Sequence, residues 1–207
     1  MLMKILITGN LGYIGTVLTQ ELIKEKYSVT GYDCGFYEDC ILSDSVKPHF
    51  QIINDIRNIS DENLKNIDCL IHLAALSNDP LGELIPGITS EINFNATLNL
   101  AKKSKKNSIK RFIYISSQSM YGISKTDDAL DEENSIKAPI SEYAKTKWNA
   151  EIELKKLIDD NFTITFLRPA TVFGKSPRLR SDIVYNNLLG SAYTSGRIDI
   201  KSDGSPI

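Results

Sequence analysis

A glycine-rich turn between an apolar run and a helix-compatible segment constrains the fold of this chain more than any other feature. Residues 3–8 are short and apolar enough to form one buried strand. Gly9, Gly12 and Gly15 follow directly, and residues 16–26 are compatible with a helix. Backbone N–H groups at such a turn, with the positive end of the helix dipole behind them, suit a pyrophosphate. The sequence therefore predicts that the chain opens with a dinucleotide-binding unit.

The three glycines have different expected tasks. Gly9 permits the tight turn, Gly12 lets a phosphate approach the backbone, and Gly15 lets the helix pack closely on the strand. The spacing is GxxGxxG rather than GxGxxG. Three glycines also suit a purely structural turn. The strand before and the helix after favour the dinucleotide interpretation.

Asp33 stands at the end of a second predicted strand, residues 27–32. In a nucleotide-binding βαβ unit, an acidic residue about 20 positions beyond the glycines accepts hydrogen bonds from the adenosine ribose and repels a 2′-phosphate. Asp33 therefore favours NAD over NADP; without the glycine turn it would be a surface aspartate. A third short strand, residues 50–53, precedes Asp55, whose carboxylate we expect near the adenine edge.

Strand and helix patterns alternate along the rest of the chain. Apolar strands are predicted at residues 68–75, 111–115 and 162–167, with helices at 89–106 and 141–160. This alternation predicts an α/β fold with a Rossmann-type, doubly wound parallel sheet and helices on both faces.

Reactive side chains follow these strands, at the sheet edge where open α/β folds bind ligands. Ser117 comes just after the strand at 111–115. Tyr143 and Lys147 lie four residues apart on a helix that Ser141 is placed to cap, so they share one face. A lysine ammonium and a positive nicotinamide ring would stabilise a tyrosine phenolate and make it usable as a base. YxxxK alone is common by chance; its order after the glycines, the aspartate and the serine makes it specific.

Charge and cysteine content bear on the possible partners. A net charge of -2 and a pI near 5.8 give no electrostatic reason to expect nucleic acid or an anionic membrane. No apolar run approaches a membrane span and no segment resembles a cleaved signal, so we expect a cytoplasmic protein. The three cysteines form neither a CxxC pair nor a cluster with the two histidines, so no metal site is predicted.

Five motifs resemble the extended short-chain dehydrogenase/reductase superfamily, and more closely its NAD-dependent nucleotide-sugar epimerase and dehydratase branch, typified by UDP-glucose 4-epimerase. They are TGNLGYIG at 8–15, HLAA at 72–75, NFNAT at 93–97, SSQSMYG at 116–122 and YAKTK at 143–147. The resemblance covers essentially the whole chain. It is specific for the superfamily and much less so for a substrate.

The resemblance implies NAD as cofactor. Tyr13 and Ile14 would lie along the pyrophosphate, Asp33 at the ribose, and Asp55 with Ile56 at the adenine. The full implied cofactor-binding set is Gly9, Gly12, Tyr13, Ile14, Gly15, Asp33, Asp55, Ile56, Leu73, Ala74, Ala75, Tyr143 and Lys147. Asn93 would be a structural or cofactor-positioning residue.

The resemblance also implies a reaction on a nucleotide sugar. Tyr143 would be the acid/base, Lys147 would hold the cofactor ribose and tune Tyr143, and Ser117 would hydrogen-bond the reacting hydroxyl. Hydride passes to the nicotinamide, the keto sugar turns over, and hydride returns on its other face, which restores NAD. The implied substrate contacts are Ser117, Ser119, Tyr143, Thr171 and Asn187, although many relatives have asparagine where Thr171 stands.

By the same resemblance, residues 1–168 would form the NAD-binding domain and residues 169–207 part of a substrate-binding lobe. Relatives continue for roughly a further hundred residues. We therefore expect a fragment, a truncated reading frame or a reduced family member, in which cofactor binding survives better than catalysis. Relatives commonly form homodimers through a four-helix bundle, which here would use helices 89–106 and 141–160.

The preferred hypothesis is a nucleotide-sugar epimerase, and three alternatives stay open. A 4,6-dehydratase usually has an acidic pair beside the active-site hydroxyl residue, whereas Gln118 and Ser119 stand there. A keto-sugar reductase using NADPH is disfavoured by Asp33. A non-catalytic NAD-binding or regulatory protein has no need of an intact serine, tyrosine and lysine set.

Overall fold

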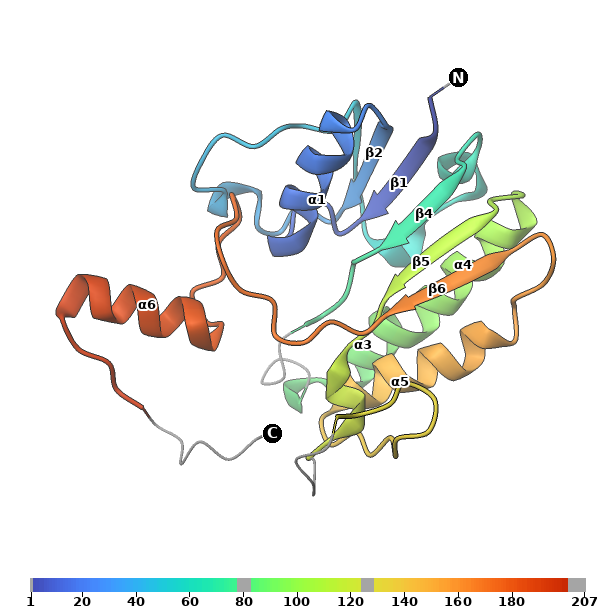
Figure 1. The fold of residues 1–207 in the computed structure, drawn as a ribbon. Coiled ribbons are helices and arrows are strands. Elements are labelled where there is room, and N and C mark those ends of the chain that lie inside the picture. Colours follow the sequence, from blue (N-terminus) through green and yellow to red (C-terminus); the bar gives the residue numbers. More distant parts are fainter. Residues whose placement is uncertain (1, 78–82, 124–128, 201–207) are drawn as a thin grey trace.

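Six parallel strands form one sheet in the order β3-β2-β1-β4-β5-β6 (Figure 1). The structure is a computed structural model that describes residues 2–77, 83–123 and 129–200. The strands are β1 (Lys4–Thr8), β2 (Ser28–Asp33), β3 (Phe50–Ile53), β4 (Cys69–His72), β5 (Arg111–Ile115) and β6 (Thr163–Leu167). The chain order reverses between β1 and β4, which is the point where such sheets bind ligands. The predicted doubly wound sheet is confirmed.

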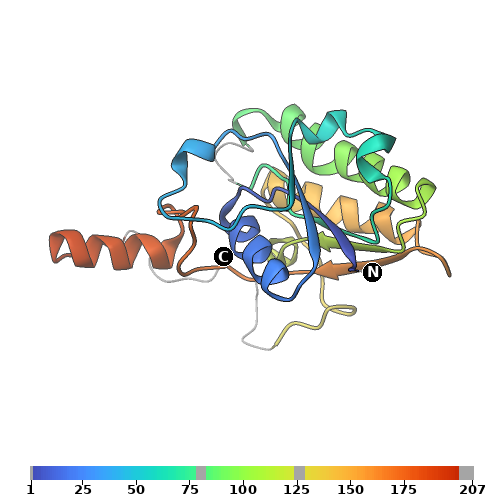
Figure 2. The same ribbon diagram turned by 90° about the horizontal axis from the view of Figure 1, so that it is seen from above.

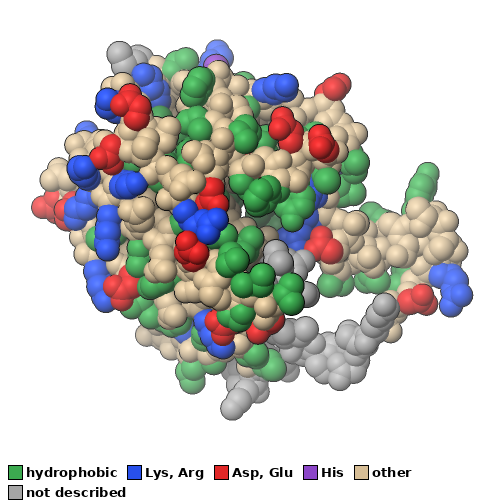
Figure 3. All heavy atoms as spheres, turned by 180° about the vertical axis from the view of Figure 1, so that it is seen from behind, with side chains coloured by type: hydrophobic (Ala, Val, Ile, Leu, Met, Phe, Trp, Pro, Cys, Tyr) green, Lys and Arg blue, Asp and Glu red, His purple; other side chains and the backbone are tan. Residues whose placement is uncertain are grey.

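Helices lie on both faces of the sheet. The described residues form α1 (Tyr13–Lys24), α3 (Pro86–Ser90), α4 (Thr97–Lys106), α5 (Glu142–Lys155) and α6 (Val184–Ser195), of which α6 stands apart from the sheet. Figure 2 shows α1 on one face and α4 and α5 on the other. On the face that α4 and α5 cover, acidic and basic side chains are interspersed rather than segregated (Figure 3), as in the pairs Lys105–Asp159 and Lys106–Asp61.

Each face of the sheet has its own apolar core, because alternate strand residues point to opposite sides. Leu6, Leu70 and Phe112 belong to the core shared with α4 and α5. Ile7 and Ile71 belong to the smaller core that Leu18 and Leu22 of α1 complete. Central strands buried on both faces explain the continuous apolar runs in the sequence.

The helix predicted over residues 89–106 is interrupted. Between α3 and α4, residues Glu91–Ala96 form a π-helical turn. One such turn shifts the following side chains around the axis, and π-turns are frequent at functional sites. Here the turn contains the buried Asn93, which reaches the end of β4.

Helix α6 lies away from the sheet (Figure 1), and none of its residues is buried. It follows the segment that leaves β6, which is where the sequence predicts the start of a substrate lobe. Within the described ranges, no helix combines the length and apolarity that crossing a bilayer requires.

Candidate functional site

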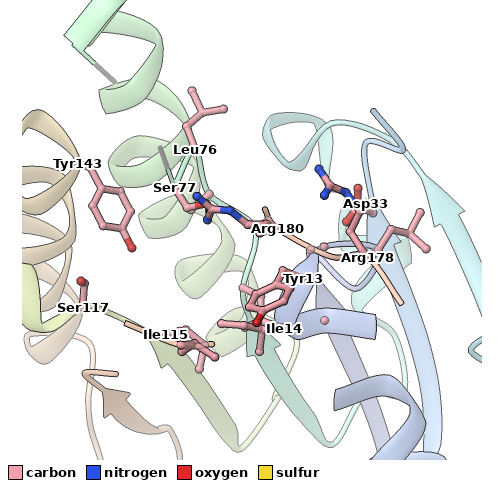
Figure 4. Close-up of a pocket in the computed structure, with 18 of the residues that line it drawn as sticks. Tyr13, Ile14, Asp33, Leu76, Ser77, Ile115, Ser117, Tyr143, Arg178 and Arg180 are labelled. Carbon is pink, nitrogen blue, oxygen red and sulfur yellow. Dashed lines mark hydrogen bonds between the residues drawn. The ribbon is translucent and has the colours of Figure 1, made fainter. Parts of the chain in front are cut away.

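A cleft of about 700 Å³ opens at the carboxyl edge of the sheet. Figure 4 shows Asp33 at one end and Ser117 with Tyr143 at the other, with Tyr13 and Ile14 of the glycine turn between them. With the exception of Asn187, every residue assigned to cofactor, substrate or catalysis from the sequence lines this cleft. The fold thus brings together residues that are up to 162 positions apart in the chain, from Gly9 to Thr171.

The glycine turn is shaped by close backbone contacts. Gly9 adopts a φ of 77°, and its N–H donates to the Tyr32 carbonyl at 2.8 Å. A Cβ on Gly15 would lie 2.2 Å from the carbonyl oxygen of Gly9. These two positions therefore require glycine for the turn and for its packing on α1. A Cβ on Gly12 would meet one atom, at 3.3 Å, so the backbone there is open toward the cleft.

Asp33 is held in a fixed orientation at the end of β2. Its Oδ2 accepts from the Leu11 N–H at 3.1 Å, and its Oδ1 accepts from the Gly35 N–H at 2.9 Å. The carboxylate thus ties the glycine turn to the loop after β2. Each oxygen retains acceptor capacity for a ribose hydroxyl.

The carboxylate of Asp55, predicted to lie near the adenine edge, already has hydrogen-bond partners within the protein. Asp55 caps a short 3-10 turn, and its carboxylate takes a bidentate interaction from Arg57, with Nη2 2.7 Å from Oδ2. This interaction holds the pKa of the Asp55 carboxyl below its usual value. Ile56 lies beside it, buried and facing the cleft. The adenine end is therefore lined by a neutralised acid and an apolar side chain.

The middle of the cleft follows the small residues after β4, Leu73 to Ala75. Asn93 fixes the next residue by a paired contact: its Oδ1 accepts from the Leu76 N–H at 2.8 Å, and its Nδ2 donates to the Leu76 carbonyl at 3.0 Å. Asn93 therefore fixes the backbone beside the cleft, and whether its role is structural or also positions the cofactor stays a prediction.

Ser117 and Ser119 form one hydroxyl pair at the end of β5. Their Oγ atoms are 2.6 Å apart, and the Ser119 N–H donates to Ser117 Oγ at 3.1 Å. Ser117 is also the N-cap of the 3-10 turn Gln118–Tyr121, so its side chain is locally fixed. Both serines line the cleft, and Ser117 lies on the same side of it as Tyr143 (Figure 4).

Tyr143 and Lys147 come from the first turns of α5, where Ser141 accepts the Ala144 N–H at 3.2 Å as the predicted cap. The Lys147 Nζ donates to the Ile115 carbonyl at 2.8 Å and lies 5.8 Å from the centroid of the Tyr143 ring. Burial lowers the pKa of Lys147 to about 7. The Lys147 ammonium therefore loses its proton close to neutral pH.

His72 is a packed core residue, as its position in an apolar strand predicts. Its Nδ1 lies 2.6 Å from Thr8 Oγ1, and its Nε2 lies 2.8 Å from Thr97 Oγ1. Burial lowers the pKa of the imidazole to about 3. Neutral His72 therefore links β1, β4 and α4. Among the described residues, no cluster of His, Cys, Asp and Glu is arranged to hold a metal ion.

Two arginines that were not among the predicted site residues also line the cleft. Arg178 stacks on the Tyr37 ring, with its guanidinium carbon 4.4 Å from the centroid. Arg180 pairs with Asp182, donates to Ser77 Oγ at 3.3 Å, and lies across the cleft from the glycine turn (Figure 4). The sequence signal that could have indicated them is the pair of positive charges in Pro177-Arg178-Leu179-Arg180, shortly after Gly174.

The two predicted contacts beyond β6 have different surroundings. Thr171 lines the cleft. Asn187, on the first turn of α6, lies outside the cleft lining, and its Nδ2 donates to the Ser181 carbonyl at 3.1 Å. Its role in binding a substrate diphosphate stays a prediction, and in this structure its side-chain amide is bonded to the backbone just before α6.

The cleft fits the parts of NAD in sequence. An open glycine backbone at the start of α1 suits a pyrophosphate. Asp33 at one side offers acceptors for ribose hydroxyls, and the buried face of Ile56 offers an apolar contact for adenine. Tyr143 stands at the other end (Figure 4), where the nicotinamide half would lie, and Lys147 Nζ is 5.8 Å from its ring centroid.

Comparisons with known proteins agree with this geometry. The model of the NAD dependent epimerase/dehydratase family matches residues 5–207. An uncharacterized UDP-glucose epimerase of Bacillus subtilis is 30% identical over 98% of this chain. The crystal structure of UDP-glucuronic acid 4-epimerase from Bacillus cereus, in complex with UDP-glucuronic acid and NAD, covers 98% of this chain at 28% identity with a TM-score of 0.80. That alignment covers 67% of the Bacillus cereus chain.

A third relative is of a different kind. Methionine adenosyltransferase 2 subunit beta of Mus musculus is 29% identical over 87% of this chain. The chain covers 66% of the Bacillus subtilis relative and 50% of this subunit. It therefore spans one half to two thirds of the length of the curated relatives that it matches.

Proposed function

The chain belongs to the NAD-dependent epimerase/dehydratase family, and we propose that it is a nucleotide-sugar epimerase that oxidises a sugar hydroxyl transiently. The observation that supports this most directly is the convergence of Ser117, Tyr143 and Lys147 at one end of a cleft whose other end carries Asp33. A cleft that only bound a nucleotide would need the end with Asp33, but it would not need the end with Ser117, Tyr143 and Lys147.

In the proposed reaction, Tyr143 removes the proton of the sugar hydroxyl as a phenolate. Lys147 holds that phenolate by its positive charge. Ser117, oriented by Ser119, hydrogen-bonds the same hydroxyl and fixes it toward Tyr143. Bound NAD supplies the hydride acceptor and donor that inversion at a carbinol carbon requires. After the keto sugar has turned over, Tyr143 returns the proton.

Features of the cleft disfavour the two enzymatic alternatives. Elimination of water by a dehydratase needs an acid beside the active-site hydroxyl residue, and the positions after Ser117 carry Gln118 and Ser119. Ser119 is itself committed to Ser117. A reductase using NADPH needs room for a 2′-phosphate, where Asp33 places a fixed negative charge.

The first test is mass spectrometry of small molecules released on denaturing the purified chain. An epimerase that restores its cofactor in each cycle is expected to retain NAD at about one molecule per chain. A nucleotide sugar released with it would identify the substrate. Release of no nucleotide, or of NADP alone, would count against a retained-NAD epimerase.

The second test separates chemistry from binding. Tyr143→Phe removes the hydroxyl and leaves the ring, so turnover of a nucleotide sugar should disappear while NAD affinity stays nearly unchanged. Tyr193→Phe is a matched control, because that side chain is 91% exposed and lies outside the cleft lining. Equal loss of turnover and NAD affinity in Tyr143→Phe would contradict the role of Tyr143.

One comparison supports a second candidate, a non-catalytic NAD-binding subunit. The Mus musculus relative carries the name of a subunit of an enzyme, and it matches this chain over much the same length. A binding subunit would retain NAD and show no turnover with any nucleotide sugar. Turnover abolished by Tyr143→Phe would eliminate it.

We also propose that the chain forms a homodimer through α4 and α5, which lie together on one face of the sheet (Figure 2). Ile152 of α5 is 39% exposed on this side. Light scattering on a size-exclusion column would give the mass. Ile152→Glu should convert a dimer of this kind to a monomer. A monomeric mass for the unmodified chain would contradict the proposed homodimer.

A further inference from the structure

One face of α5 carries ionisable groups at three successive four-residue positions: Tyr143, Lys147 and Glu151. Lys147 is 3% exposed, and Glu151 is fully buried. A buried charge is costly unless a partner compensates it. The proposed reaction uses Tyr143 and Lys147, and it leaves Glu151 unexplained.

Arg168, the first residue after β6, binds the side chain of Glu151. Its Nε lies 3.0 Å from Oε1 and its Nη2 lies 2.7 Å from Oε2, which is the planar bidentate geometry of a strong pair. Its Nη1 donates to Tyr121 Oη at 2.7 Å and to the Glu132 carbonyl at 2.7 Å. Four hydrogen-bonded acceptors fix this guanidinium, so both oxygens of the Glu151 side chain are held in place by Arg168.

Three other ionisable groups surround Lys147. Tyr114 of β5 has its ring centroid 4.8 Å from Nζ, and Tyr143 has its centroid at 5.8 Å. His72 of β4 is neutral and interacts electrostatically with Lys147. None of these supplies a negative charge at neutral pH before Tyr143 ionises. Burial lowers the pKa of Lys147, and the charge of Glu151 opposes that fall.

We propose that Glu151, fixed by Arg168, is a positioning residue that keeps Lys147 as an ammonium beside Tyr143. The proposal rests on the proposed function, in which Tyr143 acts as a phenolate. Glu151 reaches no substrate and acts through Lys147 alone. The charge of Glu151 repels the Tyr143 phenolate directly, and it stabilises the phenolate indirectly by keeping Lys147 charged. The indirect effect dominates, because Lys147 is nearer to Tyr143 than Glu151 is.

The test is a spectroscopic titration of Tyr143 in the full chain as purified. Tyrosinate absorbance is followed with pH, and the curve of the matching Tyr143→Phe variant is subtracted. Glu151→Gln should contain about tenfold less Tyr143 phenolate at pH 7 than the unmodified chain. Glu151→Asp, which keeps the charge, should titrate like the unmodified chain. Glu153→Gln, on the exposed side of the same helix, is the matched control.

A second pair of variants keeps the test decisive if Glu151→Gln does not fold. In a Lys147→Met background, Glu151→Gln removes the direct repulsion and leaves the Arg168 charge without its carboxylate partner, so it should increase the Tyr143 phenolate rather than reduce it. A change of the same sign in both backgrounds, or an effect of Glu151→Asp equal to that of Glu151→Gln, would show a merely structural role. An unmodified chain whose Tyr143 titrates like a free tyrosine would reject the proposed function itself.

Discussion

The hydroxyl of Tyr13 donates to the carbonyl of Gly174 at 2.7 Å, which joins the first residue of α1 to a segment 161 positions later. The same hydroxyl accepts from Asn186 Nδ2 at 3.1 Å. Ser176 adds a bond to the Tyr13 carbonyl at 2.7 Å. These hydrogen bonds hold the segment after β6 against the start of α1. They thereby position Arg178 and Arg180, which line the cleft.

Tyr13→Phe is expected to loosen that segment. The variant leaves the Gly174 carbonyl and the Asn186 amide without this partner, so the free energy of unfolding should fall by about 1 kcal/mol. Affinity for a nucleotide sugar and affinity for NAD should both fall, because the segment carries Thr171 and Arg180. Denaturant unfolding and calorimetric binding would measure both. Tyr193→Phe, at a side chain 91% exposed, should change neither.

Arg180→Gln should weaken binding of a diphosphate selectively. Arg180 is the cation that faces the glycine turn across the cleft, where a pyrophosphate would lie (Figure 4). A hydrogen bond to a charged group contributes about 1.5–3 kcal/mol, so ADP should bind about ten- to a hundredfold more weakly. Adenosine, which lacks the diphosphate, should bind as before.

The control for this experiment is Arg197→Gln, because Arg197 is 78% exposed and lies beyond α6. Titration calorimetry with ADP and adenosine would give four dissociation constants for the two variants. An equal loss for ADP and adenosine in Arg180→Gln would mean that the substitution disturbs the cleft as a whole.

Local patterns in the sequence were sufficient for the sheet, although β4 ends at His72 rather than at residue 75. The apolar runs at Ile5–Ile7 and Leu70–Ile71 are buried on both faces, which is why they could be identified without periodicity. Ser117 follows β5 and Asp33 ends β2, so a parallel sheet places both at the same edge. Their roles in binding and catalysis stay predictions.

What the sequence could not predict depends on contacts between distant residues. The path of residues 174–182 is set by bonds to Tyr13 and by the Leu42 N–H, which donates to the Pro177 carbonyl at 2.8 Å. No local pattern encodes those bonds, so Arg180 was missed and Asn187 was expected in the cleft. The engagement of Asp55 by Arg57 was likewise hidden. The π-turn at Glu91–Ala96 has no propensity signal comparable with that of a helix.

Gly15→Ala should damage both stability and NAD binding. Its Cβ would lie 2.2 Å from the Gly9 carbonyl oxygen and 2.6 Å from Asn10 Cα, and both are backbone atoms that cannot rotate away. We expect a loss of about 1–3 kcal/mol in unfolding free energy. Gly190→Ala in α6 is the control, since a Cβ there meets nothing within 4 Å. Equal melting temperatures for the two variants would contradict the contact.

Stability should fall with acid because of His72. Its pKa is lowered to about 3 in the folded chain, against about 6.5 when unfolded. Between these values the unfolded state binds a proton that the folded state excludes, so unfolding becomes easier as pH falls from 6.5 to 3. The loss attributable to His72 is on the order of 5 kcal/mol over that interval.

Carboxylates also contribute to acid denaturation, so the effect of His72 has to be isolated by a difference. His72→Gln is neutral throughout and retains hydrogen-bonding atoms for Thr8 and Thr97, although it lowers stability at pH 7 by disturbing their bonds to the ring. Urea unfolding of both proteins at a series of pH values would give the two curves. We expect the gap between them to narrow as pH falls from 6.5 to 4, because only the unmodified chain loses the contribution of a buried imidazole. Parallel curves over this range would mean that the pKa of His72 is the same in the folded and unfolded states, which would contradict a neutral buried ring.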